Sequence, residues 1–222
     1  DHLEAHIFSP MITEKNLKLP FISLLVSGGH TILTLVKDNS DYEVLGKTLD
    51  DSAGEVFDKV ARHLGLAYPG GPEISKAASN TNKSSYKFPR PMIKTNCYNF
   101  SFSGLKTNVT QLINKLELND LIISEIAYDF ENSIIDVLIT KTLKAAKEYN
   151  IENIVIAGGV SANRKLRMRC NLEKGEKKIF FPDIAYSTDN GAMIAYIGWL
   201  KSSKKTEDNS LEINPNPSSR FV

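Results

Sequence analysis

His2 and His6 are the residues of this sequence whose types and spacing point most directly to chemistry. On an α-helix, side chains four residues apart lie on one face, one turn apart, so both imidazoles can bind the same ion. Asp189 is a candidate third ligand from far along the chain. Two histidines and one carboxylate leave positions open for substrate oxygens, an arrangement typical of iron(II) and compatible with zinc. The alternative is a helix start with two exposed histidines, and the spacing alone does not exclude it.

The order of residues around these histidines argues against a zinc peptidase. Zinc peptidases of the HExxH type carry the glutamate directly after the first histidine, where it acts as the general base. In the sequence HLEAH the glutamate is Glu4, one position later. A metallopeptidase is therefore the least favoured of the enzyme hypotheses.

Two glycine pairs follow apolar segments and could bring backbone N–H groups close to anionic oxygens. The run Ser27-Gly28-Gly29 separates two strand-like segments, which predicts a hairpin. The pair Gly158-Gly159 follows a short apolar strand and precedes a helix that we expect to begin near Ser161, with Ser161 as its N-cap. Neither run matches the GxGxxG or GxxxxGK[ST] pattern. A tight hairpin and an ordinary strand-to-helix connection remain the plain alternatives.

Asp58 lies in segment 52–65, whose apolar residues recur at helical spacing. It is on the side away from most of those residues, where a carboxylate could accept hydrogen bonds from ribose hydroxyls. The alternative is a solvated helix face. We expect Asp50 or Asp51 to cap this helix, and the pair Gly70-Gly71, between two prolines, to form a plain turn.

These residues must be positioned by alternating strands and helices, which indicates an α/β protein. The expected strands are 21–27, 30–36, 42–48, 153–157 and 178–181. The expected helices are 52–65, 73–79, 104–116, 119–149, one from near Ser161 and one over 189–200, with a loop at 80–100. The hairpin at the front predicts that the sheet is not purely parallel, and the polar chain from Lys201 is expected to fray.

Composition indicates an ordinary globular protein. Of 222 residues, 41% are hydrophobic and 24% charged, and no apolar run reaches the ~20 residues of a membrane span. The start lacks the pattern of a signal peptide, and Cys97 and Cys170 are too few for a disulfide framework, so we expect a reducing compartment. The net charge of +1 gives no global attraction to nucleic acid.

Basic residues are nevertheless concentrated in two places, which could contact RNA phosphates or simply form a solvated surface. The first group includes the aromatic residues Tyr86 and Phe88 and comprises Lys76, Lys83, Lys87, Arg90 and Lys94; the second comprises Arg164, Lys165, Arg167 and Arg169. Ser103 and Lys106 match the SxxK pattern of serine acyl-enzymes, but the partner segments of those enzymes are missing. We therefore expect Ser103 to cap the helix that follows it.

Several segments, in this order and with these gaps, resemble the TsaD family, called Kae or Qri in other lineages. They are 2–6 (HLEAH), 26–31 (VSGGHT), 49–59 (LDDSAGEVFDK), 68–72 (YPGGP), 100–106 (FSFSGLK), 157–163 (AGGVSAN) and 187–190 (STDN). Members of this family are tRNA N6-adenosine threonylcarbamoyltransferases, formerly described as O-sialoglycoprotein endopeptidases. The resemblance extends over nearly the whole chain.

The resemblance implies the actin-like (ASKHA) fold, with two RNase H-like lobes around a nucleotide cleft. Family members usually carry a further segment before the two-histidine motif, so we expect the second lobe to be complete and the first to be truncated. Residues 1–20 would be the remnant of the first lobe with the metal-binding histidines. Residues 21–186 would form the second, nucleotide- and substrate-binding lobe, and residues 187–222 the closing helix and a tail that returns to the first lobe.

The activity implied is transfer of the threonylcarbamoyl group from threonylcarbamoyl-AMP to N6 of adenosine 37 in tRNAs that read codons beginning with A (t6A biosynthesis). The implied substrate-binding residues are Leu25, Val26, Ser27, Gly28, Gly29, Asp58, Gly71 and Asn163. The implied metal ligands are His2, His6 and Asp189, holding one divalent ion per subunit, Fe²⁺ first and Zn²⁺ as the alternative. No side chain is assigned as a nucleophile.

The same resemblance implies tRNA, a TsaB-like paralogue and a TsaE-like ATPase as partners, and no membrane. The two-histidine and SGGHT segments look closer to the bacterial and organellar branch, so the expected location is cytoplasmic, or mitochondrial for an organellar protein. An inactive fragment or scaffold subunit of the same family is the alternative function.

Overall fold

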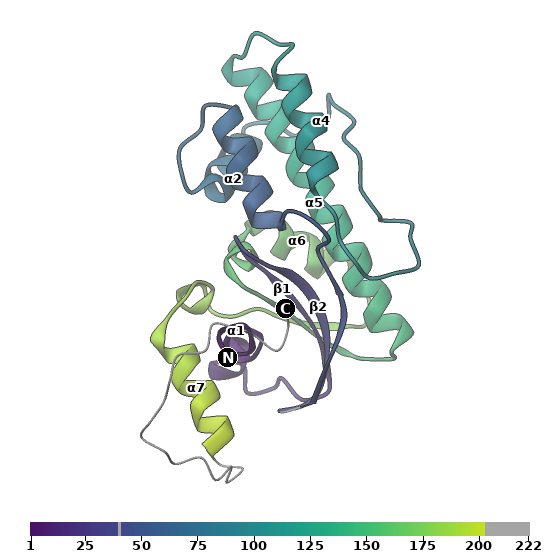
Figure 1. Cartoon of the computed structure of the whole chain (residues 1–222), viewed down its shortest axis with the longest axis vertical. Helices are drawn as coiled ribbons and strands as arrows, with labels where there is room; N and C mark the ends of the chain where they lie inside the picture. The colour runs from purple at the N-terminus through teal and green to yellow at the C-terminus, as the bar shows by residue number, and fades with distance from the viewer. Residues whose placement is uncertain (40, 203–222) are drawn as a thin grey trace.

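A five-stranded mixed sheet organises the chain, and the computed structural model describes residues 1–39 and 41–202 of it (Figure 1). The strands lie in the order β3-β2-β1-β4-β5. They are β1 (Phe21–Val26), β2 (Thr31–Asp38), β3 (Asp41–Lys47), β4 (Asn153–Ala157) and β5 (Lys178–Phe180). The first three strands pair antiparallel, whereas β4 runs parallel to both β1 and β5. The expectations of an α/β protein with a front hairpin and a mixed sheet are confirmed.

Helices cover both faces of this sheet (Figure 1). They are α1 (His2–Phe8), α2 (Ala53–His63), α3 (Gly70–Ala78), α4 (Ser103–Ile113), α5 (Asp120–Glu148), α6 (Arg164–Glu173) and α7 (Gly191–Ser202). Three short 3₁₀ turns are η1 (Ser9–Ile12), η2 (Gly159–Ala162) and η3 (Ile184–Tyr186). The long segment 80–100 between α3 and α4 carries no helix or strand, as expected. None of the helices in the described part of the chain is both long and apolar enough to cross a membrane.

Strand β1 is buried along its whole length because it lies between two hydrophobic cores. Successive strand residues point to opposite faces of a sheet. Ile22 and Leu24 accordingly join a large core with α2 to α6, whereas Phe21 and Leu25 join a second core with α1 and α7. Burial on both faces explains why β1 reads as a continuous apolar run rather than an alternating one.

The N-cap of α2 is Ser52, so the expectation that Asp50 or Asp51 caps this helix was wrong. The Ser52 hydroxyl accepts from the Glu55 N–H at 3.2 Å and donates to the Gly28 carbonyl at 2.6 Å. Asp50 instead accepts from the backbone N–H groups of Phe102 and Ser103. Contacts with distant segments thus decide which of the three adjacent residues, Asp50, Asp51 or Ser52, caps the helix.

Helix α3 begins at Gly70, so Gly70-Gly71 forms a helical first turn and not the plain turn that the flanking prolines suggested. The reason is tertiary, because Asp58 Oδ1 accepts from the Gly70 N–H at 2.7 Å and satisfies a donor that a helix start leaves open. A Cβ on Gly70 would lie 2.7 Å from both the Ala61 Cβ and the Asp58 Cα. Glycine at this position therefore allows α2 and α3 to pack closely.

Two further capping predictions were wrong. Helix α6 is capped by Asn163 rather than Ser161, because the η2 turn intervenes and Asn163 Oδ1 accepts from the Leu166 N–H at 2.8 Å. Ser103 is the first residue of α4 rather than its cap, and its hydroxyl donates to Asp51. At the other end, Lys201 still belongs to α7, and the polar tail 203–222 lies outside the described residues.

Candidate metal centre and the glycine turns beside it

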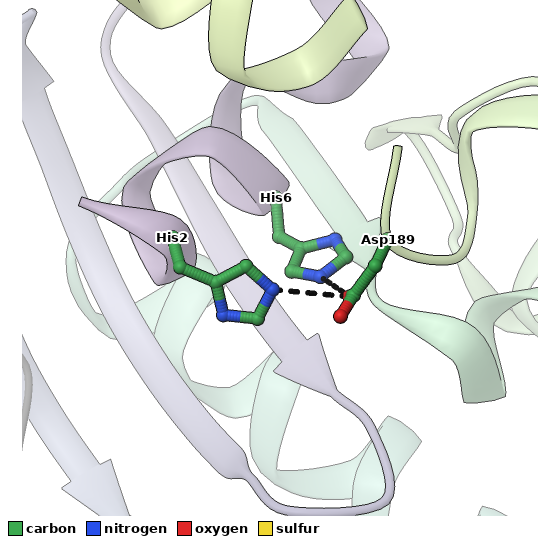
Figure 2. Close-up of side chains that lie close together, drawn as sticks. All are labelled: His2, His6 and Asp189. Carbon is green, nitrogen blue, oxygen red and sulfur yellow. Dashed lines mark hydrogen bonds and ion pairs between the residues drawn. The ribbon is translucent and has the colours of Figure 1, made fainter. Parts of the chain in front are cut away.

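His2, His6 and Asp189 converge on one point, although Asp189 is far from the histidines in sequence (Figure 2). The two Nε2 atoms lie 3.0 and 2.9 Å from the same oxygen, Asp189 Oδ1. The histidines project from one face of α1, and Asp189 comes from the segment that leads into α7. The expected trio is thus assembled by the fold.

Helix α1 holds the two imidazoles because its N-terminus, its apolar side and its Glu4 side chain are all fixed. Asp1 caps the helix by accepting from the N–H groups of Leu3 and Glu4. Leu3 and Ile7 are buried in the core that α1 shares with β1 and α7. Glu4, which is only 1% exposed, is bound by the Tyr42 hydroxyl and by Lys201, and so ties α1 to β3 and α7.

The surroundings of His6 and Asp189 favour the protonation states in which these two side chains bind a metal. Burial lowers the pKa of the His6 imidazole, and the nearby His2 lowers it further, against the hydrogen bond with Asp189. The hydrogen bond from His2 holds the pKa of the Asp189 carboxyl below its usual value, with smaller help from His6. A neutral imidazole beside an ionised carboxylate is the form in which these residues act as ligands.

The geometry fits a divalent ion. Two adjacent ligand atoms that each lie at ~2.1 Å from an ion are about 3 Å apart when they subtend a right angle. The two Nε2-to-Oδ1 distances match this separation, and the three candidate ligand atoms all lie within 4.8 Å of one another. His2 and Asp189 are exposed at 50% and 77% of their side-chain surface, whereas His6 is buried, so one side of the trio opens to solvent. His6 Nδ1 is buried without a hydrogen-bond partner among the described residues.

The two glycine turns lie side by side at the carboxyl ends of β1 and β4. These strands run parallel with Leu25 opposite Ala157, so Ser27-Gly28 and Gly158 follow at the same edge of the sheet. Gly158 has a φ of +86°, and a Cβ there would lie 2.5 Å from the Val26 carbonyl oxygen. The strand order changes direction between β1 and β4, and the carboxyl ends of the strands at such a point are where open α/β sheets usually bind ligands.

The glycine turns also adjoin the metal trio. A Cβ on Gly159 would have the Thr188 methyl group as its nearest neighbour, at 4.0 Å, and Thr188 precedes Asp189. On the β1–β2 turn, burial lowers the pKa of His30, and the charge of His2 lowers it further. The Ser27-Gly29 turn, the Gly158-Gly159 turn and the trio therefore form one continuous region, which we call the candidate site.

Asp58 and Gly71 lie close together where α2 packs against the start of α3. Asp58 binds the Gly70 N–H, which brings it next to Gly71 in the first turn of α3. A Cβ on Gly71 would have no atom within 4 Å, and the same holds for Gly28 and Gly29. At these three glycines the fold leaves open space next to the backbone, unlike at Gly158.

Asn163 has two partners that the sequence did not indicate. Its Nδ2 lies 2.8 Å from Glu131 Oε1 and 2.9 Å from the Ser75 hydroxyl. Glu131 is 2% exposed and sits within α5 among apolar neighbours. No motif marks it, because a single glutamate on a long helix is normally solvated, and only the packing of α3 and α6 buries this one.

Four of the nine basic residues in the two clusters pair with carboxylates of α5. Arg90 and Arg169 both bind Asp136 at 2.9 Å, from opposite sides. Lys165 lies 3.4 Å from Glu131, and Lys83 lies 3.5 Å from Glu125. Phe88 is buried in the core. These side chains anchor the 80–100 loop and α6 to α5, which weakens the hypothesis that both clusters are free to bind RNA.

Comparison with known proteins identifies relatives over most of the chain. Residues 1–196 match the family model described as "TsaD: tRNA N6-adenosine threonylcarbamoyltransferase". A protein with that description from Thermosipho africanus (strain TCF52B) is 48% identical over 219 residues, 97% of this chain and 66% of that protein. One from Buchnera aphidicola subsp. Baizongia pistaciae (strain Bp) is 45% identical, with 97% and 65% covered. The chain thus spans slightly less than two thirds of the length of these relatives.

Solved structures share the fold at much lower sequence identity. HypF of T. kodakarensis superposes with a TM-score of 0.69 at 16% identity, covering 91% of this chain and 36% of that one. Component A of the (R)-2-hydroxyglutaryl-CoA dehydratase of Acidaminococcus fermentans gives a TM-score of 0.55 at 17% identity, covering 92% of this chain and 69% of that one. These similarities concern the fold alone.

Proposed function

Because the chain belongs to the TsaD family of tRNA N6-adenosine threonylcarbamoyltransferases, we propose that it transfers a threonylcarbamoyl group from threonylcarbamoyl-AMP to N6 of a tRNA adenosine. The observation that carries the proposal is the trio His2, His6 and Asp189, which lies beside two glycine turns at one sheet edge. An acyl-adenylate has an anionic nucleotide end and a polar acyl end. The candidate site offers an environment suited to each.

The trio would hold the acyl end of the substrate through one divalent ion, with iron(II) as our first choice and zinc as the alternative. Such an ion would supply Lewis-acid polarisation of the carbamoyl oxygen. His6 would bind through Nε2, since that atom faces Asp189. The exposure of His2 and Asp189 leaves room for substrate oxygens on the open side of the trio.

The nucleotide end would lie against the glycine turns and the helix starts. Ser27, Gly28 and Gly29 would contact the acyl-phosphate region, where Gly28 and Gly29 leave open space next to the backbone. Leu25 and Val26, which the resemblance also implies, are buried in β1 and would support this turn from behind. Asp58 would accept hydrogen bonds from ribose hydroxyls, because Gly70 uses one of its oxygens and the other accepts no hydrogen bond among the described residues. Gly71 and Asn163 would complete the contacts with the adenosine.

The reaction itself is a direct acyl transfer. The exocyclic amine of the tRNA adenosine attacks the carbamoyl carbon, a C–N bond forms, and the bond from that carbon to the phosphate oxygen breaks. AMP leaves with the electron pair, and the amine loses one proton. Direct transfer needs no side-chain nucleophile, so the protein contributes mainly by holding both reactants in line.

The proposal extends to the fold and the partners of the whole protein. The sheet and the helices α2 to α6 on one of its faces would form one lobe of an actin-like, two-lobed molecule, and α1 and α7 on the other face would belong to the other lobe. tRNA would be the acceptor, and a TsaB-like paralogue and a TsaE-like ATPase would assist. A cytoplasmic location, or a mitochondrial one for an organellar protein, would suit these partners.

The test is transfer of label from threonylcarbamoyl-AMP to unmodified tRNA by the purified chain, with candidate partner proteins and iron(II) or zinc. A double variant, His2→Ala with His6→Ala, is measured in parallel. Metal-dependent labelling that the double variant loses supports the proposal. If a longer relative labels tRNA under the same conditions and this chain does not, the chain is an inactive or scaffolding form of the family.

A further inference from the structure

A carboxylate that the proposed reaction does not use lies buried directly behind Asn163. Glu131, on α5, is 2% exposed. Its Oε1 accepts from the Ser75 hydroxyl of α3 at 2.6 Å and from Asn163 Nδ2 at 2.8 Å. Since Asn163 is the N-cap of α6, three helices meet at this one oxygen atom.

These contacts decide which way the Asn163 carboxamide faces. Asn163 Oδ1 accepts from the Leu166 N–H at 2.8 Å, and Nδ2 donates to Glu131. A carboxylate only accepts hydrogen bonds, and a backbone N–H only donates them. Exchanging the oxygen and nitrogen of the amide would therefore place like groups against each other at both ends. The network leaves a single orientation for the side chain.

Lys165 supplies the positive charge that a buried carboxylate requires. Its Nζ lies 3.4 Å from Glu131 Oε2 and 3.8 Å from the centre of the Tyr128 ring. Burial lowers the pKa of Lys165, and attraction to Glu131 acts in the opposite direction. Both oxygens of Glu131 thus have partners, so the carboxylate is held rigidly.

We propose that Glu131 is a positioning residue, which orients the Asn163 carboxamide so that its remaining hydrogen-bonding capacity faces the adenosine of the acyl-adenylate. This inference rests on the proposed function, since it requires Asn163 to contact the nucleotide. Ser75 assists by bridging the two side chains, because its hydroxyl donates to Glu131 and accepts from Asn163. Glu131 itself does not reach the ligand.

The first measurement is the equilibrium affinity of the purified full chain for AMP, the nucleotide part of the substrate. Glu131→Met keeps the length of the side chain and removes the acceptor, and we expect it to weaken AMP binding about tenfold, the size of a typical coupling between contacting residues. Glu131→Gln keeps an acceptor oxygen, so affinity should stay within about twofold of the unmodified chain. Glu125→Met is the matched control, because Glu125 is also buried on α5 but pairs with Lys83.

The second measurement separates positioning from a general structural role. In a background that carries Asn163→Ala, a residue that acts through Asn163 loses its effect, so adding Glu131→Met should change AMP affinity by less than about twofold. Adding Ser75→Ala in the same Asn163→Ala background should likewise change AMP affinity by less than about twofold, because Ser75 is proposed to act through Asn163. Thermal unfolding of each variant identifies any that no longer folds.

The possible outcomes separate this inference from the proposed function. The positioning role alone is overturned if Glu131→Met leaves AMP affinity unchanged. It is also overturned if Glu131→Met weakens AMP binding by the same factor in the presence and in the absence of the Asn163 side chain. An unmodified chain that binds no AMP overturns the nucleotide site itself. A loss of affinity that depends on Asn163 and is restored by glutamine supports the inference.

Discussion

Asp189 Oδ1 lies 2.9 Å from His6 Nε2, and the segment that carries Asp189 is joined to α1 through the contacts of α7. A carboxylate held this close to two imidazoles is the feature on which our proposal of a metal centre, rather than a helix with two exposed histidines, rests. The interpretation therefore depends on Asp189 as much as on the histidines.

Replacing Asp189 by Asn should lower the affinity for iron(II) and zinc by at least about 100-fold, because loss of a ligand costs more than loss of a residue that merely supports one. Competition with a chelator of known affinity measures the change. Asp183→Asn is the control, since Asp183 is an exposed residue of the same segment whose carboxylate accepts from the Ala185 N–H and lies outside the trio. Equal metal affinity in both variants would remove Asp189 from the site.

Adjacent glycines of α3 should respond in opposite ways to alanine. Gly70→Ala places a Cβ 2.7 Å from the Asp58 Cα and 2.8 Å from the Phe57 carbonyl oxygen, so the free energy of unfolding should fall by about 2 kcal/mol or more. Gly71→Ala meets no atom within 4 Å, so stability should be unchanged or rise by up to ~1 kcal/mol. Urea unfolding compares the two variants.

If Gly71 lines the nucleotide site, the Gly71→Ala variant should nevertheless bind AMP less tightly. Because its stability is expected to be intact, a loss of AMP affinity can be attributed to the ligand rather than to the fold. A Gly71→Ala variant with full AMP affinity would place the nucleotide elsewhere.

The sequence predicted the sheet and most helices, because burial sets the periodicity of each element. The apolar run of β1 follows from burial on both of its faces, and the stripe along α5 follows from burial of that side of the helix in the large core. The caps were predicted less well. Asp51 and Ser161 are good capping residues, but Asp51 is drawn to Lys106 and Ser103, and the η2 turn separates Ser161 from α6.

The residues of the candidate site also differ in how well the sequence predicted them. His2 and His6 could be found from their spacing, because both lie on one helix. Asp189 required the resemblance, since no local pattern links it to α1. Glu131 could not be found at all, because its burial depends on helices that precede and follow it in the chain.

Asp51 should make stability depend on pH in the acid range. Although burial opposes ionisation, hydrogen bonds from Lys106, Ser103 and Lys59 lower the pKa of its carboxyl to about 2. A carboxyl with a depressed pKa in the folded state stabilises the fold above its unfolded value near 4 and loses this contribution as the pH falls toward 2. The contribution is about 2 kcal/mol at neutral pH.

Unfolding in urea between pH 5 and pH 2 checks this expectation. Asp51→Asn should be less stable than the unmodified chain at pH 5, and the difference should shrink as the pH approaches 2. A difference in unfolding free energy that stays constant across this range would show that Asp51 does not titrate with a depressed pKa.

Glu4 gives a test of the peptidase hypothesis. In an HExxH peptidase the glutamate faces the metal and acts as the base. Here Glu4 is 1% exposed and is bound by Tyr42 and Lys201, on contacts that join α1 to β3 and α7. Glu4→Gln should therefore lower the free energy of unfolding by about 1–3 kcal/mol, because a hydrogen-bonded buried charge loses its pairing with Lys201.

The Glu4→Gln variant should bind metal with an affinity close to that of the unmodified chain. Glu4 contacts Tyr42 and Lys201, whereas the candidate ligands His2 and His6 contact Asp189. Zinc-loaded chain should cleave no peptide substrate, with or without the substitution. This assignment would be reversed if the unmodified chain cleaved a peptide and Glu4→Gln abolished the cleavage without lowering stability. Such a result would mean that the Glu4 carboxylate acts in catalysis rather than in holding α1 in place.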